Sequence, residues 1–144
     1  MGEEKQKTVR ILIKEPYKEP YEKVVDNNLE TFQEIVGGLI ECVEMPGMKN
    51  VDLFVNEEGK LDRLQGNFWL PEYEDCAVGT CYLIGYNPKD GSNLDLTDKQ
   101  IKQAKKYIDL YKIPEGMDLY EDFYALRAFM TKRYNIQKRK NAEM

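Results

Sequence analysis

The stretch from residue 29 to residue 43 constrains the fold most, because a helix, a glycine break and a strand follow one another in it without a spacer. Its apolar residues recur at the spacing of one helical face: Leu29, Phe32, Ile35 and Val36. Asn27 or Asn28 can cap the start, since a short side-chain oxygen accepts hydrogen bonds from the first backbone N–H groups. Gly37-Gly38 ends the helix, because glycine adopts positive φ without steric cost. Leu39–Val43 then has the composition of a strand, so the stretch predicts an α+β protein.

Further strands are predicted where β-branched and aromatic residues cluster: Thr8–Lys14, Tyr21–Val25, Val51–Val55, Leu61–Leu64 and the stretch that leads from Asp75 to Gly85. Thr8–Lys14 and Tyr21–Val25 are expected to pair antiparallel. Asn56–Lys60 is expected to form a hairpin turn with Gly59 in the left-handed conformation. Gly66–Pro71 is expected to be a bulky apolar loop. Gly79 marks a close approach of two backbones, because it has no side chain.

Two helices are predicted near the C-terminus. Thr97 and Gln100 match a capping box at the start of the first, and Asp118–Glu121 is a second capping pattern at the start of the second. The second helix is expected to have a broad apolar stripe from Leu119 to Tyr134. This stripe packs on the rest of the chain, or it forms a homodimer or partner-binding face, and both alternatives stay open.

The predicted architecture is α+β: a mixed, mostly antiparallel sheet of about five or six strands with one helix packed on it. The order of the elements is compatible with a β-grasp-like arrangement. Residues 8–96 are expected to form this α+β domain and residues 97–144 a helical C-terminal extension. No apolar run approaches the ~18 residues that a membrane span requires, and no signal peptide pattern is seen. The expected location is therefore the cytoplasm.

Charge is distributed unevenly along the sequence. Residues 15–75 contain 15 acidic and 5 basic side chains, a net charge of −10, whereas residues 132–144 have a net charge of +4. The plain interpretation is a solvated acidic surface and a basic helix end. The more specific interpretation is an acidic face that attracts a basic partner and repels nucleic acid.

The sequence has no pattern that identifies a reaction. There is no histidine, which removes the commonest general base, and the three cysteines (Cys42, Cys76 and Cys81) have poor spacing for zinc. The glycines do not match a phosphate-binding loop that precedes a helix. Many carboxylates are present, but a two-carboxylate hydrolase needs two of them to converge in a cleft. We therefore expect no enzyme activity, no catalytic residues, no cofactor and no metal.

Two groups of side chains are candidates for binding a partner. Glu57, Glu58 and Asp62 lie in and after the predicted hairpin turn. The aromatic candidates are Phe68, Trp69 and Tyr73, because tryptophan and tyrosine often anchor interfaces. The alternative for Trp69, which is the commoner arrangement, is that it caps the core against the sheet.

A family resemblance rests on several pieces that occur in a fixed order: Ile11–Pro16 with Pro20, Leu29-Glu30, Gln33–Gly38, Ile40-Glu41, Asn56–Leu61, Asn67, Val78–Thr80 and Gly85. On these pieces, residues from about Val9 to about Thr97 resemble the domain-of-unknown-function family 3846 of phages, plasmids and conjugative elements. The two C-terminal helices lie outside the resemblance. Phe68-Trp69 stands where a polar residue is expected after Asn67.

The resemblance implies an accessory protein of a mobile element, without an established activity, in a counter-defence setting that includes antirestriction and anti-CRISPR proteins. The leading hypothesis is a non-enzymatic protein that binds a host protein, such as a defence nuclease, and inhibits it. One alternative is a nucleic-acid-binding module that uses the basic tail from residue 132 to residue 144. Another is a small-ligand or nucleotide-handling protein that uses the stretch Asn67–Tyr73.

Overall fold

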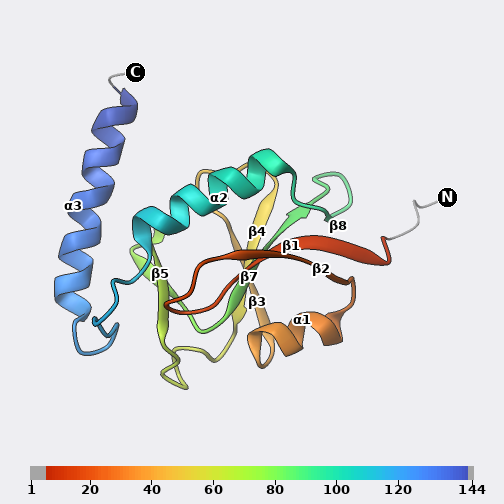
Figure 1. Ribbon diagram of the computed structural model, residues 1–144, viewed down its shortest axis with the longest axis horizontal. Helices are drawn as coiled ribbons and strands as arrows, with labels where there is room; N and C mark the ends of the chain where they lie inside the picture. The colour runs from red at the N-terminus through yellow and green to blue at the C-terminus, as the bar shows by residue number, and fades with distance from the viewer. Residues whose placement is uncertain (1–5, 143–144) are drawn as a thin grey trace.

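The computed structural model describes residues 6–142 and has an antiparallel sheet of six strands, a smaller sheet of two strands, and three α-helices (Figure 1). The larger sheet has the order β2-β1-β7-β4-β3, with β8 paired to β7. Its strands are β1 (Thr8–Lys14), β2 (Tyr21–Asp26), β3 (Ile40–Glu44), β4 (Val51–Asn56), β7 (Cys81–Tyr86) and β8 (Asn93–Leu94). The α+β class is confirmed. Every strand pair within the described residues is antiparallel, so the parallel pair of a mixed sheet is not seen there.

Helix α1 (Leu29–Val36) covers one face of the sheet, as predicted (Figure 1). The side chain of Asn28 caps it by accepting a hydrogen bond from the backbone of Thr31, and Gly37 ends it in the left-handed conformation. Phe32 is buried and its ring stacks on Tyr82, with 5.0 Å between the centroids. This face of the sheet therefore forms one half of the core.

Helix α2 (Asp98–Tyr111) lies across the opposite face (Figure 1). The predicted capping box is present, with Thr97 and Gln100 bonded to each other's backbone. The buried side of α2 packs into the same cluster as Leu12, Leu53 and Phe68 through three residues: Ile101, Ala104 and Ile108. The helix expected to begin an extension at residue 97 thus contributes to the core of the sheet.

Helix α3 (Phe123–Ala142) packs beside α2 and the small sheet through Leu126 and Met130, which are fully buried. The predicted start at the Asp118 cap is wrong, because α3 begins at Phe123. The carboxylate of Asp118 instead accepts hydrogen bonds from the backbone N–H groups of Tyr120 and Glu121, which form a separate turn before the helix. Of the two alternatives for this helix, packing on the rest of the chain is seen. Its C-terminal half extends away from the sheet (Figure 1), and a homodimer through it stays a prediction.

Three of the predicted secondary-structure assignments are wrong, and each concerns the region after β4. Leu61–Leu64 lies in a run of turns and not in a strand. The expected apolar loop at 66–71 is the buried strand β5 (Gly66–Leu70), followed by a short 3-10 helix (Pro71–Tyr73). The single expected strand from Asp75 is two strands in different sheets, β6 (Asp75–Val78), which pairs with β5, and β7. Apolar side chains on both faces of β5 explain the error, because such a run lacks the alternation of a half-exposed strand.

The two glycines singled out in this region differ from each other. Gly79 separates β6 from β7 at φ +71°, and a Cβ on it would lie 2.7 Å from a methyl carbon of Leu64. The predicted close approach of two backbones is therefore wrong in its partner, because the atoms that crowd Gly79 belong to a side chain. Gly59 is not in the left-handed conformation; Arg63 adopts positive φ in this turn instead. Gly59 is required by space, since a Cβ there would lie 2.6 Å from Val78.

Candidate functional site

A cleft of about 230 Å³ lies between the β3–β4 edge of the large sheet and the small sheet. Apolar side chains form its walls: Val43, Val55, Leu70, Ala77 and Val78. Polar side chains of both sheets and of the turn after β4 complete the lining: Glu41, Asn56, Glu57, Lys60, Tyr73 and Asp75. The volume is below the range of about 300–1,000 Å³ typical of small-molecule sites, so the cleft has the size for one long side chain.

The polar side chains of the cleft are only partly paired with one another. Lys60 forms an ion pair with Asp75, with 2.5 Å between its Nζ and a carboxylate oxygen. Glu41 and Glu57 have no cationic partner within 4.0 Å in the described part of the chain. Their two carboxylates therefore leave the cleft with an excess of negative charge.

Tyr73 joins the small sheet to the outer strand of the large sheet. Its hydroxyl donates a hydrogen bond of 2.6 Å to the backbone carbonyl of Glu44. Partial burial raises the pKa of Tyr73, and the nearby Glu44 carboxylate raises it further. The hydroxyl thus remains protonated and keeps donating at neutral pH.

Strand β3 is the edge strand of the large sheet beside this cleft. The backbone N–H of Met45 donates to the carbonyl of Val51, and that of Glu57 donates to the carbonyl of Leu39. Bonded positions alternate along an antiparallel pair, so the odd-numbered residues of β3 are the ones bonded to β4. The backbone groups of Ile40, Cys42 and Glu44 consequently point outward. The Glu44 carbonyl is bonded by Tyr73, whereas Ile40 and Cys42 present their N–H and C=O groups at the edge.

The structure brings two of the six predicted partner-binding residues together. Glu57 and Tyr73 line the cleft. Glu58 and Asp62 are exposed in the turn outside it, linked by a backbone hydrogen bond. Phe68 and Trp69 are buried, so the prediction of an exposed aromatic patch is wrong for both, and the alternative of a core role for Trp69 is confirmed.

Other residues of the cleft are not predictable from the sequence. Nothing local to Lys60 or Asp75 indicates that the chain brings them together. Glu41 is one of many carboxylates in the sequence, and no local pattern distinguishes it. The stretch Asn67–Tyr73, expected to be a ligand loop, begins with a buried strand, in which the amide of Asn67 is bonded to the backbone of Lys14 and of Gly79.

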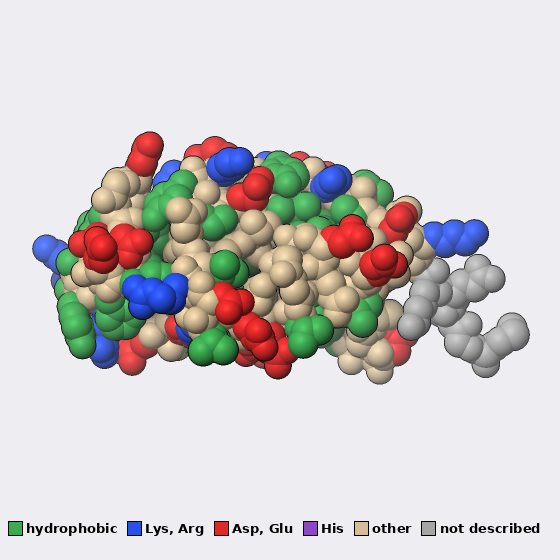
Figure 2. All heavy atoms as spheres, turned by 90° about the horizontal axis from the view of Figure 1, so that it is seen from below, with side chains coloured by type: hydrophobic (Ala, Val, Ile, Leu, Met, Phe, Trp, Pro, Cys, Tyr) green, Lys and Arg blue, Asp and Glu red, His purple; other side chains and the backbone are tan. Residues whose placement is uncertain are grey.

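Acidic side chains do not form one continuous patch on the face seen in Figure 2. They gather in separate groups, with apolar and neutral surface between them. Local geometry, as in the cleft, decides where their charge can act.

The three cysteines lie in strands of the two sheets and are free thiols. Burial raises the pKa of Cys76 to about 12 and that of Cys81 to about 12. Cys42 is exposed, but partial desolvation and the neighbouring Asp52 raise its pKa to about 11. Among residues 6–142, no three metal-ligating side chains are grouped as a metal site would require.

We expect alkylation of the native protein to distinguish these thiols. The thiolate is the reactive form, so a shift from the ordinary pKa of 9.0 to about 11 slows Cys42 about 100-fold at pH 7. Its rate should rise about tenfold per pH unit until the pH approaches this pKa. Cys76 and Cys81 should react only after unfolding. Peptide mass spectrometry after iodoacetamide treatment measures all three, and a Cys42 rate that levels off near pH 9 would contradict the prediction.

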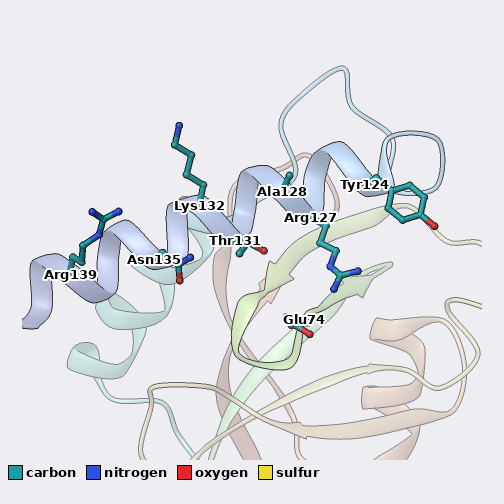
Figure 3. A pocket seen from close by; sticks show the side chains of 8 residues that line it. All are labelled: Glu74, Tyr124, Arg127, Ala128, Thr131, Lys132, Asn135 and Arg139. Carbon is teal, nitrogen blue, oxygen red and sulfur yellow. The ribbon is translucent and has the colours of Figure 1, made fainter.

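Helix α3 presents a basic face to solvent beyond the small sheet. Figure 3 shows Arg127 directed toward Glu74, while Lys132 and Arg139 point away from the rest of the molecule. Arg133 is held differently, since its guanidinium donates a hydrogen bond of 2.7 Å to the carbonyl of Leu110. Nucleic-acid binding through the tail stays a prediction, and residues 143 and 144 of that tail lie outside the described residues.

No helix within residues 6–142 combines the length and the apolar character that crossing a membrane requires. The residues on which a signal peptide prediction depends, 1–5, lie outside the described part.

Comparison with known proteins gives one match. No curated protein and no solved structure matches the chain. A family model matches residues 9–112, which takes in both sheets, α1 and α2 and ends before α3. The match therefore reaches past residue 97, where the resemblance traced on the sequence ended. Because it covers most of the chain, the protein belongs to the family described as Domain of unknown function (DUF3846).

Proposed function

We propose that this protein is a non-enzymatic binding protein that holds a basic, extended segment of a partner protein along the edge of β3. The observation that carries the proposal is the position of the acidic cleft directly beside a sheet edge with outward backbone groups. A segment that adds to an edge strand gains affinity from main-chain hydrogen bonds and specificity from its side chains. Both kinds of contact are available at this place.

The cleft suits a lysine or arginine side chain of the partner. Such a side chain lays its aliphatic part on apolar surface and places its charge at the end. Val43 and Val55 offer the apolar surface, and Glu41 and Glu57 offer carboxylates that have no partner within the described chain. Charge complementarity of this kind raises association rates and suppresses unsuitable partners.

The resemblance to proteins of mobile elements suggests what the partner is. We propose a host protein, with a nuclease of a defence system as the leading case, since such proteins present basic surfaces to nucleic acid. Inhibition by an acidic protein requires binding and no chemistry. The protein would then act in the cytoplasm of the bacterial host.

Two changes at this edge should each weaken capture of the partner. We expect Glu41→Lys with Glu57→Lys to reduce capture at least about tenfold, because close charge pairs at interfaces contribute about 1.5 kcal/mol or more. We expect Cys42→Pro to do the same, since it removes an outward N–H and leaves the hydrogen bonds to β4 in place. Tagged protein, incubated with nuclease-treated host lysate and analysed by quantitative mass spectrometry, provides the measurement.

Matched controls make this test specific. Glu115→Lys with Glu121→Lys makes the same change in net charge at exposed positions outside the cleft and should leave capture unchanged. Far-UV circular dichroism verifies that each variant is folded. If the control pair loses the partner equally, or if Cys42→Pro retains full capture, the β3 edge is not the binding surface. A partner lost on nuclease treatment of the lysate would favour nucleic-acid binding instead.

A further inference from the structure

A second cavity, of about 500 Å³, lies between the end of β1, the β1–β2 connection and α2. It is separated from the β3 cleft by β7 and β4, so it is independent of the proposed function. Five lysines line it: Lys14, Lys18, Lys105, Lys106 and Lys112. The only carboxylates of its described lining are those of Glu19 and Asp109. In a chain with a net charge of −5, this is a local concentration of positive charge.

Lys14 is the unusual member of the group, because its side chain is only 1% exposed. Its Nζ donates a hydrogen bond of 2.6 Å to the carbonyl of Glu15. Within residues 6–142, no carboxylate oxygen lies within 4.0 Å of this nitrogen. Burial lowers the pKa of Lys14, as expected of an ammonium group that is removed from water. Buried charges in proteins are normally paired, so the site is short of an anion.

The fold holds Lys14 in place. Along β1, Ile11 and Ile13 pack on the α1 side of the sheet, whereas Leu12 joins the cluster on the α2 side. Lys14 follows Leu12 by two residues and therefore faces α2 as well. The backbone of Lys14 is fixed from the other direction, since the amide of Asn67 donates a hydrogen bond of 2.7 Å to its carbonyl.

The remaining lysines are exposed and surround the opening. Lys112 is 2.9 Å from Asp109 and 3.6 Å from Glu19, and Lys18 is 3.8 Å from Glu15. These are solvent-exposed pairs of small energetic value, so a ligand can replace them at little cost. Lys106 is in no ion pair within the described residues.

We propose that this cavity binds a small molecule with two or more phosphate groups, with Lys14 beneath one phosphate and the exposed lysines around the others. The size of the cavity lies within the range of about 300–1,000 Å³ found for small-molecule sites. Several ammonium groups around one cavity match a compact polyanion. A nucleic-acid strand fits less well, because a backbone leaving the cavity along β2 would meet the carboxylates of Glu19 and Glu22.

Calorimetric titration of the whole chain with inorganic pyrophosphate tests the site. We expect saturable binding that Lys14→Met and Lys106→Ala each weaken at least about tenfold, the effect of losing one charge-assisted hydrogen bond. Lys102→Ala removes the same charge from an exposed position of α2 outside the cavity and should change the affinity less than about twofold. Lys106 is exposed, so its variant tests the site even if Lys14→Met fails to fold.

Further titrations identify the source of the phosphate groups. ATP that binds more tightly than pyrophosphate would indicate a nucleotide, and pyrophosphate that binds more tightly would indicate an inorganic ligand; both support the proposal. An oligonucleotide that binds while pyrophosphate and ATP do not would overturn it. Equal weakening by Lys102→Ala would reduce the effect to general charge attraction and would also overturn it. A Lys14→Met variant that is more stable but binds pyrophosphate with unchanged affinity would overturn the proposal as well, because Lys14 would then not contact the ligand.

Discussion

Replacing Trp69 with alanine should lower the free energy of unfolding by about 3–5 kcal/mol, the cost of truncating a large buried aromatic side chain. Trp69 is 1% exposed, and its ring lies 5.8 Å from that of Phe123 between centroids. It belongs to the cluster that joins the small sheet to α3, together with Leu126 and Met130. The loss should therefore weaken the attachment of α3 and the small sheet at once. Urea denaturation followed by far-UV circular dichroism measures it.

Tyr124→Ala is the matched control for this prediction. Tyr124 lies next to Phe123 at the start of α3, but it is 81% exposed. A surface substitution of this kind should change stability by no more than about 0.5 kcal/mol. If Trp69→Ala costs less than about 1 kcal/mol, or no more than the control, the packing of α3 described above is incorrect.

Asn67→Ala should cost about 2–4 kcal/mol, although the side chain is small. The amide nitrogen of Asn67 donates hydrogen bonds to the carbonyls of Lys14 and Gly79, at 2.7 and 2.8 Å, deep between the two sheets. Alanine would leave both carbonyls without this donor, although the Lys14 carbonyl keeps a weaker one, the thiol of Cys81 at 3.7 Å. Each buried group left unpaired costs about 1–3 kcal/mol. Part of the cost is offset, because the oxygen of Asn67 is itself buried without a partner in the described residues.

Thermal and urea unfolding measure this loss of stability, and the control is a variant of an asparagine that makes no such contacts. Asn135→Ala serves for the comparison, since Asn135 is exposed on α3. We also expect faster hydrogen exchange at the end of β1 and around Gly79, where the two carbonyls lie. Stability equal to that of Asn135→Ala would show that water replaces the amide without loss.

The sequence predicted the elements whose signals are local. Asn28 and Gly37 define the ends of α1 through their own side chain or φ angle, and Thr97 with Gln100 defines the start of α2. Each of these signals spans a few residues and needs no tertiary contact to be interpreted. The antiparallel pairing of β1 and β2 was likewise predictable, because a short connection joins them.

Elements that depend on distant contacts were missed. The strand β5 is buried on both faces, so its sequence gives the same apolar run whether it is a loop in the core or a strand. Leu61–Leu64 has the composition of a strand, but the turn closes first, with Leu64 bonded through its backbone to Gly59. Composition could not decide either case.

The candidate sites illustrate the same limit. Glu57 and Tyr73 were predicted separately, and only the tertiary structure places them in one cleft. Lys14 is a charged residue at the end of β1, a position that suggests exposure, yet α2 covers its side chain. Its burial results from a helix more than eighty residues further along the chain, which no local pattern encodes.

The connection between β6 and β7 has a consequence for ligand entry. One wall of the cleft is formed by β6, and the opposite wall includes β4. Strand β7 pairs with β4, and only Gly79 and Thr80 separate β6 from β7. The two walls are therefore joined by a tether too short to let them separate as independent bodies. The cleft is preorganised, so a partner that enters it need not order it first. The association rate should be correspondingly high, because no opening of the cleft has to precede binding.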